Sequence, residues 1–326
     1  MLVFLLRRLV QAIFVMIIIS AISFAIQNKL GDPVQQHMSM TVSPTERAQL
    51  RQELGLNDSI VVQYWRFAKK AIHGDLGTSY YYKEPVLDVI FKKLPATVEL
   101  AFCAIIIVIG IATPCGILAA IKPRNIVSRL VVALSTMGLS IPIFIVAIFL
   151  VYVFSIKLHL APSFGRGQTT NVFGLWDSGL FSKDGLRHLI LPSITLAFAL
   201  MPIFVRLIRA EMMEVLQSDY IRFAWSKGLP TRRIYFIHAL KNTMLPVITV
   251  GGIQAGTLVA YTILTESIFQ WPGMGFLFMD AVSRVDTPLI AAYLIVVGGI
   301  FVITNTFVDL IYGLVNPTVK LANHGL

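Results

Sequence analysis

The most informative pattern in this chain is a set of six long stretches that contain no charged residue and are rich in hydrophobic side chains. Five of them reach the ~18–20 residues that a helix needs to cross a hydrocarbon core of about 30 Å. The fourth is shorter and gains His188 and Leu207–Ile208 at its ends. Runs of this length exclude a soluble α/β enzyme with buried strands. The pattern predicts an all-α integral membrane protein with six transmembrane helices, over Leu9–Asn28, Leu100–Ile121, Leu130–Ile156, Leu189–Val205, Asn242–Thr265 and Thr287–Val308.

The composition agrees with this class, since 56% of the 326 residues are hydrophobic and only 13% are charged. An ordinary soluble domain is about 25% charged. The first apolar stretch follows Arg7-Arg8 and could be a signal peptide, but it is longer than a typical signal-peptide core of about 7–15 residues. We therefore expect residues 1–30 to form an uncleaved first transmembrane helix.

The positive charges are distributed unevenly between the two sides of the predicted membrane protein. A formal net charge of +10 in a soluble protein would suggest a nucleic-acid partner. Here thirteen bases fall into segments that share one side if the amino terminus is cytoplasmic, whereas the short outside loops after the third and fifth helices hold only Arg166, Lys183, Arg187 and Arg284. This contrast predicts an N-in, C-in orientation and no nucleic-acid partner. The thirteen bases are Arg7, Arg8, Lys122, Arg124, Arg129, Arg206, Arg209, Arg222, Lys227, Arg232, Arg233, Lys241 and Lys320.

Residues 31–95 are expected to form an external, partly helical segment. Ser43, Pro44 and Glu46 fit a capping box at the start of one helix. A second helix is predicted after Asp58 and should end at Gly74. Its apolar stripe could rest on the membrane surface or on the helical bundle; the stripe consists of Val61, Trp65, Ala68 and Ile72.

Prolines and glycines inside the predicted spans mark places of special geometry. Pro114 and Pro142 should each kink or locally break a helix, and Pro142 could also serve as a flexible point in a gate. Gly252 and Gly256 form a GxxxG pattern, which favours close helix packing in lipid. The two cysteines, Cys103 and Cys115, are about 18 Å apart along one predicted helix and cannot pair with each other.

A compact basic segment, 206–241, separates the fourth and fifth apolar stretches. Its first part predicts a helical run that Gly228 closes with a positive φ angle, and Pro230 stops continuation. Thr231 is the expected cap of a second short helix. Three interpretations compete: a basic loop that only sets topology, a DNA-binding helix-turn-helix, which two flanking membrane spans disfavour, and a rigid docking element for a soluble motor protein.

The segment "DYIRFAWSKGLPTRRIYFIHALKNTMLP" resembles the coupling loop of binding-protein-dependent ABC transporter permeases, in its oligopeptide/dipeptide version. Ala224, Gly228 and Leu240 match the general family pattern, while Arg222 replaces a Glu. Phe223 and Trp225 depart from the peptide-permease variant, which usually has Thr and Arg there. The resemblance covers nearly the whole chain, with "RRLVQAIFV", "GDPV", "ELGLND", "QYWRF", "HGDLGTS", "LPATVEL", "LILPSITLA", "EVLQSDYIR", "TILTESIFQWPGMG" and "VDLIYGLVNP" in family order.

The resemblance implies a type-1 ABC importer permease fold in a multi-pass protein of the bacterial inner membrane, and a B-type subunit that imports peptides. It places the permease core at 96–317, a cytoplasmic coupling loop at 206–243 and a cytoplasmic tail at 318–326. The implied partners are a second homologous permease, two cytoplasmic ATPase subunits that use ATP and Mg, and an external solute-binding protein.

The chain has no phosphate-binding loop, metallo-helix or nucleophile elbow of its own, so we expect no enzyme activity, bound cofactor or metal. Alternative solutes are nickel complexes, oligosaccharides or opines. An ion-coupled secondary transporter is the alternative class.

Two sets of candidate functional residues follow. Gly228 is expected to set the backbone shape of the coupling loop, Ala224 to allow close approach, and Arg222 and Lys227 to meet acidic partner residues. The full coupling set is Tyr220, Arg222, Ala224, Trp225, Lys227, Gly228 and Leu229.

The second set is a possible gate or pathway. Glu99 and Glu266 stand near the ends of predicted spans, where charge is costly and often functional, although solvation at the interface is the favoured alternative. Trp271 could instead anchor at headgroup level. This second set is Glu99, Pro142, Glu266 and Trp271.

Overall fold

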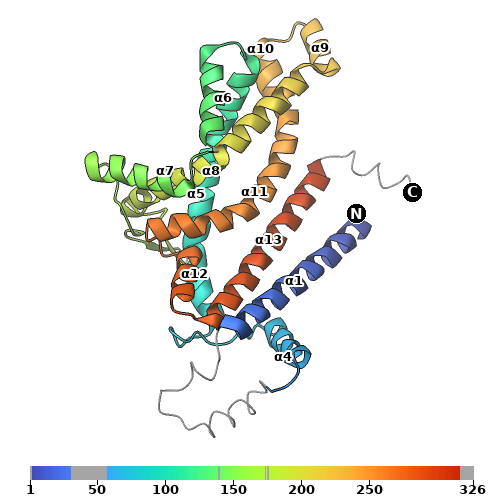
Figure 1. Cartoon of the computed structure of the whole chain (residues 1–326). Helices are drawn as coiled ribbons and strands as arrows, with labels where there is room; N and C mark the ends of the chain where they lie inside the picture. Colours follow the sequence, from blue (N-terminus) through green and yellow to red (C-terminus); the bar gives the residue numbers. More distant parts are fainter. Residues whose placement is uncertain (1, 31–56, 139, 173, 175, 316–326) are drawn as a thin grey trace. The chain divides into compact units, whose positions relative to one another are not determined.

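The computed structural model describes residues 2–30, 57–138, 140–172, 174 and 176–315. The capping box expected at Ser43–Glu46 and the tail 318–326 lie outside this part of the chain. The described chain is almost entirely helical, with one short β-hairpin (Figure 1). Its elements are α1 (Leu2–Leu30), α4 (Ile60–Ile72), α5 (Val86–Ile121), α6 (Ile126–Gly138), α7 (Ile143–Leu150), the π-helix η1 (Val151–Lys157), β1 (Thr170–Val172), β2 (Trp176–Ser178), α8 (Lys183–Leu216), α9 (Asp219–Ser226), α10 (Thr231–Arg233), the π-helix η2 (Ile234–Ala239), α11 (Leu240–Ile268), α12 (Met274–Ser283) and α13 (Thr287–Val315).

The predicted number of membrane spans is confirmed if one bent pair of helices counts as a single span. Five helical segments of the described chain are long and apolar enough to cross a membrane. The sixth candidate is the pair Ile126–Gly138 and Ile143–Lys157, which is bent by 109°. The five segments are Leu6–Lys29, Val86–Ile121, Lys183–Leu216, Thr231–Leu258 and Thr287–Val308.

The third predicted span breaks into two helices at Pro142, as this proline predicted. Pro142 precedes α7 with φ −58° and ψ 138°, an extended conformation outside the helical region. Proline lacks the N–H that a continuing helix needs, and it disfavours helical geometry in the residue before it. At Pro114 the outcome differs, because α5 continues through this proline without a break.

The chain divides into two compact units. Unit 1 contains Met1–Pro95 and Pro272–Val302, and unit 2 contains Ala96–Trp271 and Ile303–Leu326. The helices α5 and α13 each contribute residues to both units.

Within unit 1, Asp286 joins the segment before α5 to the start of α13. Its carboxylate accepts hydrogen bonds from the Ser79 hydroxyl and from the backbone N–H groups of Tyr80 (3.2 Å) and Tyr81 (3.3 Å). The same carboxylate accepts from the N–H of Leu289 at 3.4 Å, in the first turn of α13. One buried acid thus caps a helix and fixes residues more than 200 positions earlier in the chain.

A second set of contacts holds the same segment of unit 1. The guanidinium carbon of Arg284 lies 3.7 Å from the ring centroid of Tyr81, and the Tyr82 hydroxyl donates to Asp280 at 3.2 Å. Burial, followed by the nearby Asp280 carboxylate, raises the pKa of Tyr82. The tyrosine-rich turn before α5 is therefore attached to unit 1 at several points.

Within unit 2, α8 is the central helix and packs on α6, α7 and α11. The helix α8 also contacts α5 closely, because α5 has a glycine, Gly116, opposite Ile208 of α8. A Cβ added to Gly116 would come within 2.7 Å of the Ile208 Cβ. In α11, a Cβ on Gly252 would come within 2.2 Å of the Val308 side chain, so the predicted close approach occurs between helices of this chain.

We predict that Gly116→Ala destabilises unit 2, because even one methyl group overpacks the contact with Ile208, at a cost of about 1–3 kcal/mol. Gly110→Ala is the matched control six residues earlier in α5, since a Cβ there meets no atom within 4 Å. Thermal unfolding of the purified protein should show a lower Tm for Gly116→Ala and an unchanged or higher Tm for Gly110→Ala. Equal Tm values for the two variants would contradict the close α5–α8 contact.

Candidate functional site

A sharp joint separates α8 from the basic segment that the sequence singled out. The helical run expected to continue to Gly228 ends at Leu216, and this part of the prediction is wrong. Ser218 adopts an extended conformation (φ −70°, ψ 153°), and its hydroxyl bonds back to the carbonyl of Val215 at 2.6 Å. Serine competes with the helix for backbone hydrogen bonds, which explains why the chain restarts here as the separate helix α9.

Gly228 closes α9 as predicted. Its φ angle is +72°, a left-handed conformation that glycine adopts without the cost of a Cβ. The N–H of Gly228 donates to the carbonyl of Trp225 (2.9 Å), and the N–H of Leu229 donates to that of Ala224 (3.3 Å). This pair of bonds is a Schellman motif, in which the last carbonyls of the helix are satisfied by the turn itself.

The second arm of the segment differs from the short, separately capped helix that was expected. Pro230 (φ −65°, ψ 139°) precedes the helix, and Thr231 is its first residue rather than its cap. The helix α10 continues through the π-helix η2 directly into α11, so the second arm leads into the membrane span without a break. Hereafter "the hairpin" denotes residues 219–239, which contain α9, the Gly228 turn, α10 and η2 (Figure 1).

Apolar and aromatic contacts hold the two arms of the hairpin together. Ile221, Ala224 and Ile234 are buried in the core of unit 2. The Trp225 and Tyr235 rings pack edge to face, with centroids 6.2 Å apart. The methyl side chain of Ala224 therefore allows a close approach within this chain.

Other hairpin side chains remain exposed at the surface of the described chain. Phe223 is 60% exposed, and the Lys227 Nζ lies 4.5 Å from its ring centroid. Arg222 is exposed, as are Phe236 and Ile237 on the second arm. Aromatic residues and arginine are enriched in protein–protein interfaces, so this surface is suited to a folded partner.

Of the remaining coupling candidates, Leu229 and Tyr220 help to hold the hairpin. Leu229 is partly buried against the core of unit 2, and the Tyr220 hydroxyl accepts a hydrogen bond from Asn242 at 2.7 Å. The structure therefore assigns Ala224, Gly228 and Leu229 to the shape of the hairpin, and it leaves Arg222 and Lys227 at its surface.

A second site in unit 2 is a buried cluster of polar groups around Glu99. One Glu99 oxygen accepts from Arg166 Nη2 at 2.8 Å and from the Gly179 N–H at 3.2 Å. Arg166 also donates to the carbonyl of Asp177 at 2.6 Å, and its guanidinium carbon lies 5.8 Å from the ring centroid of Trp271. Glu99 is only 4% exposed, so the expected solvation of this carboxylate at the interface is wrong.

Glu266 is buried in the same region and forms the adjoining part of the cluster. The Thr97 hydroxyl donates to one of its carboxylate oxygens at 2.7 Å, and its backbone carbonyl accepts from the N–H of Trp271 at 2.8 Å. The indole N–H of Trp271 donates to the carbonyl of Ala96 at 2.9 Å. Glu266 and Trp271 are both 0% exposed, so neither interfacial solvation of Glu266 nor headgroup anchoring of Trp271 is correct.

The structure thus brings together three of the four predicted gate or pathway residues. Pro142 does not belong to this group, because it lies at the bend between α6 and α7. Sequence reasoning missed Arg166 and Thr97, which pair with the two acids. No local pattern could have found the Glu99–Arg166 pair, because the two residues are 67 positions apart and Arg166 lies in a loop. We call Thr97, Glu99, Arg166, Glu266 and Trp271 the buried polar cluster.

Close backbone packing near the start of α8 helps to position one hydrogen-bond donor of the cluster. A Cβ added to Gly185 would lie 2.3 Å from the carbonyl oxygen of Gly179, so only glycine fits there. This contact positions the Gly179 N–H that donates to Glu99. Within the described residues, the Nε of Arg166 and one oxygen of Glu99 have no hydrogen-bond partner.

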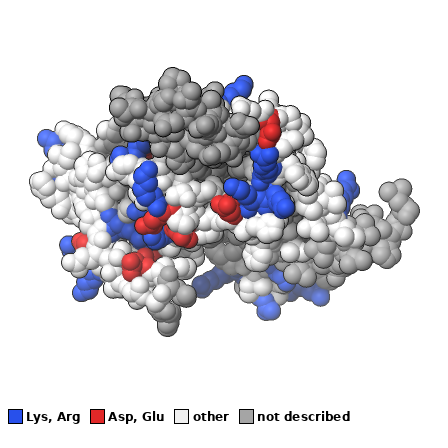
Figure 2. Space-filling view, turned by 90° about the horizontal axis from the view of Figure 1, so that it is seen from below, with Lys and Arg blue, Asp and Glu red and all other residues white. Residues whose placement is uncertain are grey.

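Charged and acidic side chains elsewhere on the described chain form no obvious further site. In the described part of the face shown in Figure 2, basic and acidic side chains lie close to one another. Among the described residues, no three His, Cys, Asp or Glu side chains gather in a way that could hold a metal ion.

The helices and the hairpin define a multi-pass membrane protein of the transport permease class. Residues 112–321 match the family described as "Binding-protein-dependent transport system inner membrane component", and residues 1–101 match the amino-terminal family of such membrane components. The chain belongs to this family of binding-protein-dependent permeases.

Named relatives agree over the full length of the chain. The dipeptide transport system permease protein DppB of Escherichia coli K12 is 39% identical, and the alignment covers 98% of this chain and 99% of the relative. The oligopeptide transport system permease protein AppB of Bacillus subtilis is 34% identical, over 97% and 99% of the two chains.

A solved structure supports the fold. A chain of the inward-facing MetNI methionine ABC transporter aligns with a TM-score of 0.53 at 16% identity, covering 71% of this chain and 97% of that one. The fold is that of a type-I ABC importer permease.

Family membership confirms several expectations. The chain is a multi-pass inner-membrane permease subunit and is not itself an enzyme. ATP is hydrolysed by a partner ATPase, and a binding protein is the other implied partner.

We predict that Glu99 and Arg166 depend on each other for the stability of unit 2. Arg166→Met should cost about 3–5 kcal/mol in the free energy of unfolding, because it leaves a buried carboxylate without its counter-charge. The double variant Glu99→Gln/Arg166→Met should lose less than the sum of the single variants in denaturant titrations. The exposed pair Arg222–Asp219 is the control and should show almost no coupling. Additive costs for Glu99 and Arg166 would contradict the buried ion pair.

Proposed function

We propose that this permease admits peptides, as one half of a translocation pathway completed by a second homologous permease subunit. The support is the agreement between relatives of both dipeptide and oligopeptide systems, each aligned over nearly the whole chain. Two cytoplasmic ATPase subunits and an external solute-binding protein complete the proposed assembly. In this assembly the permease core comprises residues 96–317, and residues 31–95 form its external segment.

We propose that the hairpin, within the cytoplasmic loop 206–243, is the element that couples ATP hydrolysis to transport. The single observation that supports this most is the self-contained hydrogen bonding of the Gly228 turn, together with the packing of both arms on unit 2. A partner that pushes on exposed Arg222, Phe223 or Lys227 meets a fixed shape rather than a mobile loop. Coupling requires that the hairpin make different contacts with the two states of the ATPase pair.

The buried polar cluster is the second functional element in this proposal and forms part of the gate on the external side. A buried ion pair adds little net stability compared with apolar packing. In this proposal the Glu99–Arg166 ion pair holds α5, the loop around Arg166 and the end of α11 together while the gate is closed. The contacts of the cluster separate when the gate opens during transport. The α6–α7 bend at Pro142 supplies a second place where helices of the same unit can change their angle.

We predict that Gly228→Asp abolishes ATP-dependent uptake of a labelled dipeptide by the reconstituted assembly and leaves membrane insertion intact. The added side chain has free space inside the chain, so its effect comes from strain at φ +72° and from a new acid on the partner-facing surface.

Gly74→Asp is the matched control, because Gly74 also has a positive φ (+80°) and open space around its Cβ, but lies outside the hairpin and outside the buried polar cluster. It should retain transport-linked ATPase activity. Unchanged coupling in Gly228→Asp would refute the hairpin assignment. Wild-type uptake that follows an ion gradient in the absence of ATP would refute the transporter class.

We predict that Glu266→Gln lowers peptide uptake between about 5- and 150-fold, the range expected for a coupling free energy of 1–3 kcal/mol. Glutamine keeps an acceptor for the Thr97 hydroxyl but removes the negative charge, so the Tm should change little. Thr265→Val is the control, because among the described residues the Thr265 hydroxyl bonds within its own helix, to the carbonyl of Tyr261. Wild-type uptake and gate opening in Glu266→Gln would remove Glu266 from the gate.

A further inference from the structure

The helix α4 is fixed against one end of the first membrane span. The Tyr64 hydroxyl lies 2.8 Å from the Ser20 hydroxyl of α1, and the Phe24 ring packs against both Tyr64 and Phe67, with centroids 5.6 Å apart in each case. A hydrogen bond of 3.4 Å from Asn28 to Gln63 completes the contact. These residues all belong to unit 1.

The contacts determine the depth of α4 relative to the bilayer. The candidate span of α1 is Leu6–Lys29, and α4 contacts it between Ser20 and Asn28. At 1.5 Å per residue, this is about the last 13 Å of the span, where the hydrocarbon core gives way to headgroups.

The side of α4 that faces away from its polar side chains is apolar and exposed. Val61, Trp65 and Ile72 are 76%, 70% and 84% exposed, and no residue of α4 is buried. At 100° per residue these three side chains fall within about 40° of one another around the helix. The prediction of an apolar stripe is confirmed, and the described chain does not cover it.

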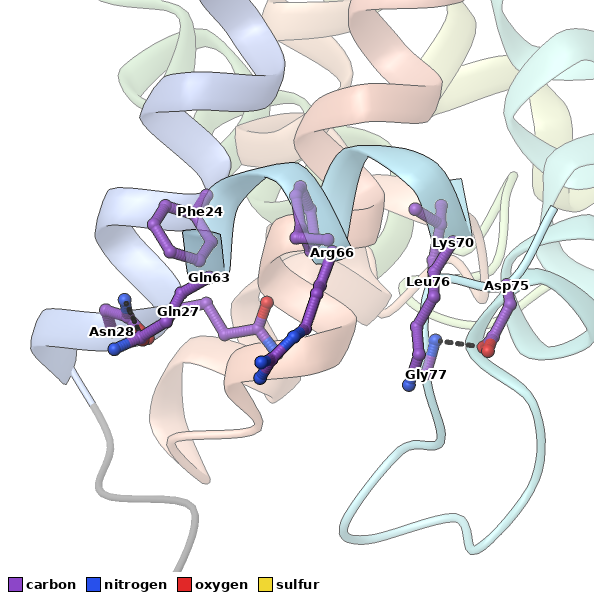
Figure 3. A pocket seen from close by; sticks show the side chains of 10 residues that line it. Phe24, Gln27, Asn28, Gln63, Arg66, Lys70, Asp75, Leu76 and Gly77 are labelled. Carbon is purple, nitrogen blue, oxygen red and sulfur yellow. Dashed lines mark hydrogen bonds between the residues drawn. The ribbon is translucent and has the colours of Figure 1, made fainter. Parts of the chain in front are cut away.

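The opposite side of α4 is polar. Gln63, Arg66 and Lys70 line a pocket of about 260 Å³ together with residues of α1 and the Asp75–Gly77 turn (Figure 3). On the helical wheel Arg66 and Lys70 lie more than 90° from the stripe, so α4 has one side suited to lipid and another suited to water.

We propose that α4 is an interfacial helix, whose Val61–Trp65–Ile72 stripe inserts into the lipid bilayer at the end of α1. Three observations favour lipid over a protein partner. The stripe lies at the level of α1 side chains that are themselves exposed and apolar, such as Ile22. Tryptophan is enriched where acyl chains meet headgroups. The cations of α4, Arg66, Lys69 and Lys70, complement anionic headgroups beside an inserted stripe.

This placement fixes where the pocket opens. With the stripe in lipid, the side that carries Arg66 and Lys70 faces the aqueous phase. In an N-in orientation this is the external phase, and the lipid is that of the outer leaflet.

The test measures where single side chains of α4 lie, in the assembled transporter reconstituted in vesicles of phosphatidylethanolamine and phosphatidylglycerol. Single cysteines at positions 61, 65, 66, 70 and 72 carry a nitroxide, in a Cys103→Ala/Cys115→Ala background. Collision with oxygen, which partitions into lipid, is compared with collision with a water-soluble nickel chelate. Oxygen should dominate at 61, 65 and 72, and the nickel chelate at the control positions 66 and 70.

Each alternative gives a different result. Dominant nickel collisions at 61, 65 and 72 would place the stripe in water, and low collision rates with both agents would show that a protein partner covers it. Either result overturns the proposal. Vesicles of phosphatidylcholine alone should reduce the oxygen excess at position 65, and an equal excess would remove anionic lipid from the proposal.

Discussion

The contact between α5 and α8 at Gly116 is the interaction on which the rest of unit 2 depends. The two helices approach until a single methyl group would not fit, and the same pair reaches both functional sites. Near one end, α5 carries Thr97 and Glu99, and the start of α8 positions the loop that binds Glu99. At the other end, α8 stops at Leu216, where the hairpin begins. Glu99 and the end of α5 at Ile121 are about 33 Å apart along the helix axis, so this pair of helices spans the distance between the buried polar cluster and the start of the hairpin.

The sequence was sufficient where a local chemical rule decides the structure. Long charge-free stretches can satisfy their backbone groups in lipid only as helices, so the spans were predictable. Glycine followed closely by proline predicted the turn at Gly228, which has the expected positive φ. It was insufficient at Ser218, where a competition between side-chain and helical hydrogen bonds interrupts the helix. A break at Pro142 was predicted, but its angle of 109° was not. The partners of Glu99 and Glu266 come from distant parts of the chain, and only the fold shows that these acids are buried.

The structure also explains how the chain can depart from the peptide-permease pattern without losing the hairpin. The matching positions Ala224, Gly228 and Leu240 maintain its shape, through burial, a left-handed backbone and packing against the core of unit 2. The departing residues Phe223 and Trp225 both have exposed side chains, although Trp225 also packs on Tyr235. Substitution at such positions changes the chemistry offered to a partner and leaves the backbone as it was. This division separates the residues that build the hairpin from those whose side chains remain exposed on it.

The two connections of the hairpin to the membrane spans differ in mechanical compliance. On one side the helix ends at Leu216 and restarts after Ser218, so the helical backbone is interrupted at Gln217–Ser218. On the other side the helical backbone is continuous from Thr231 to Ile268. In the coupling proposed for the hairpin, a push on α9 would therefore reach the membrane through the helix that continues into α11, whose far end carries Glu266. The asymmetry of the two connections would give that push one favoured route.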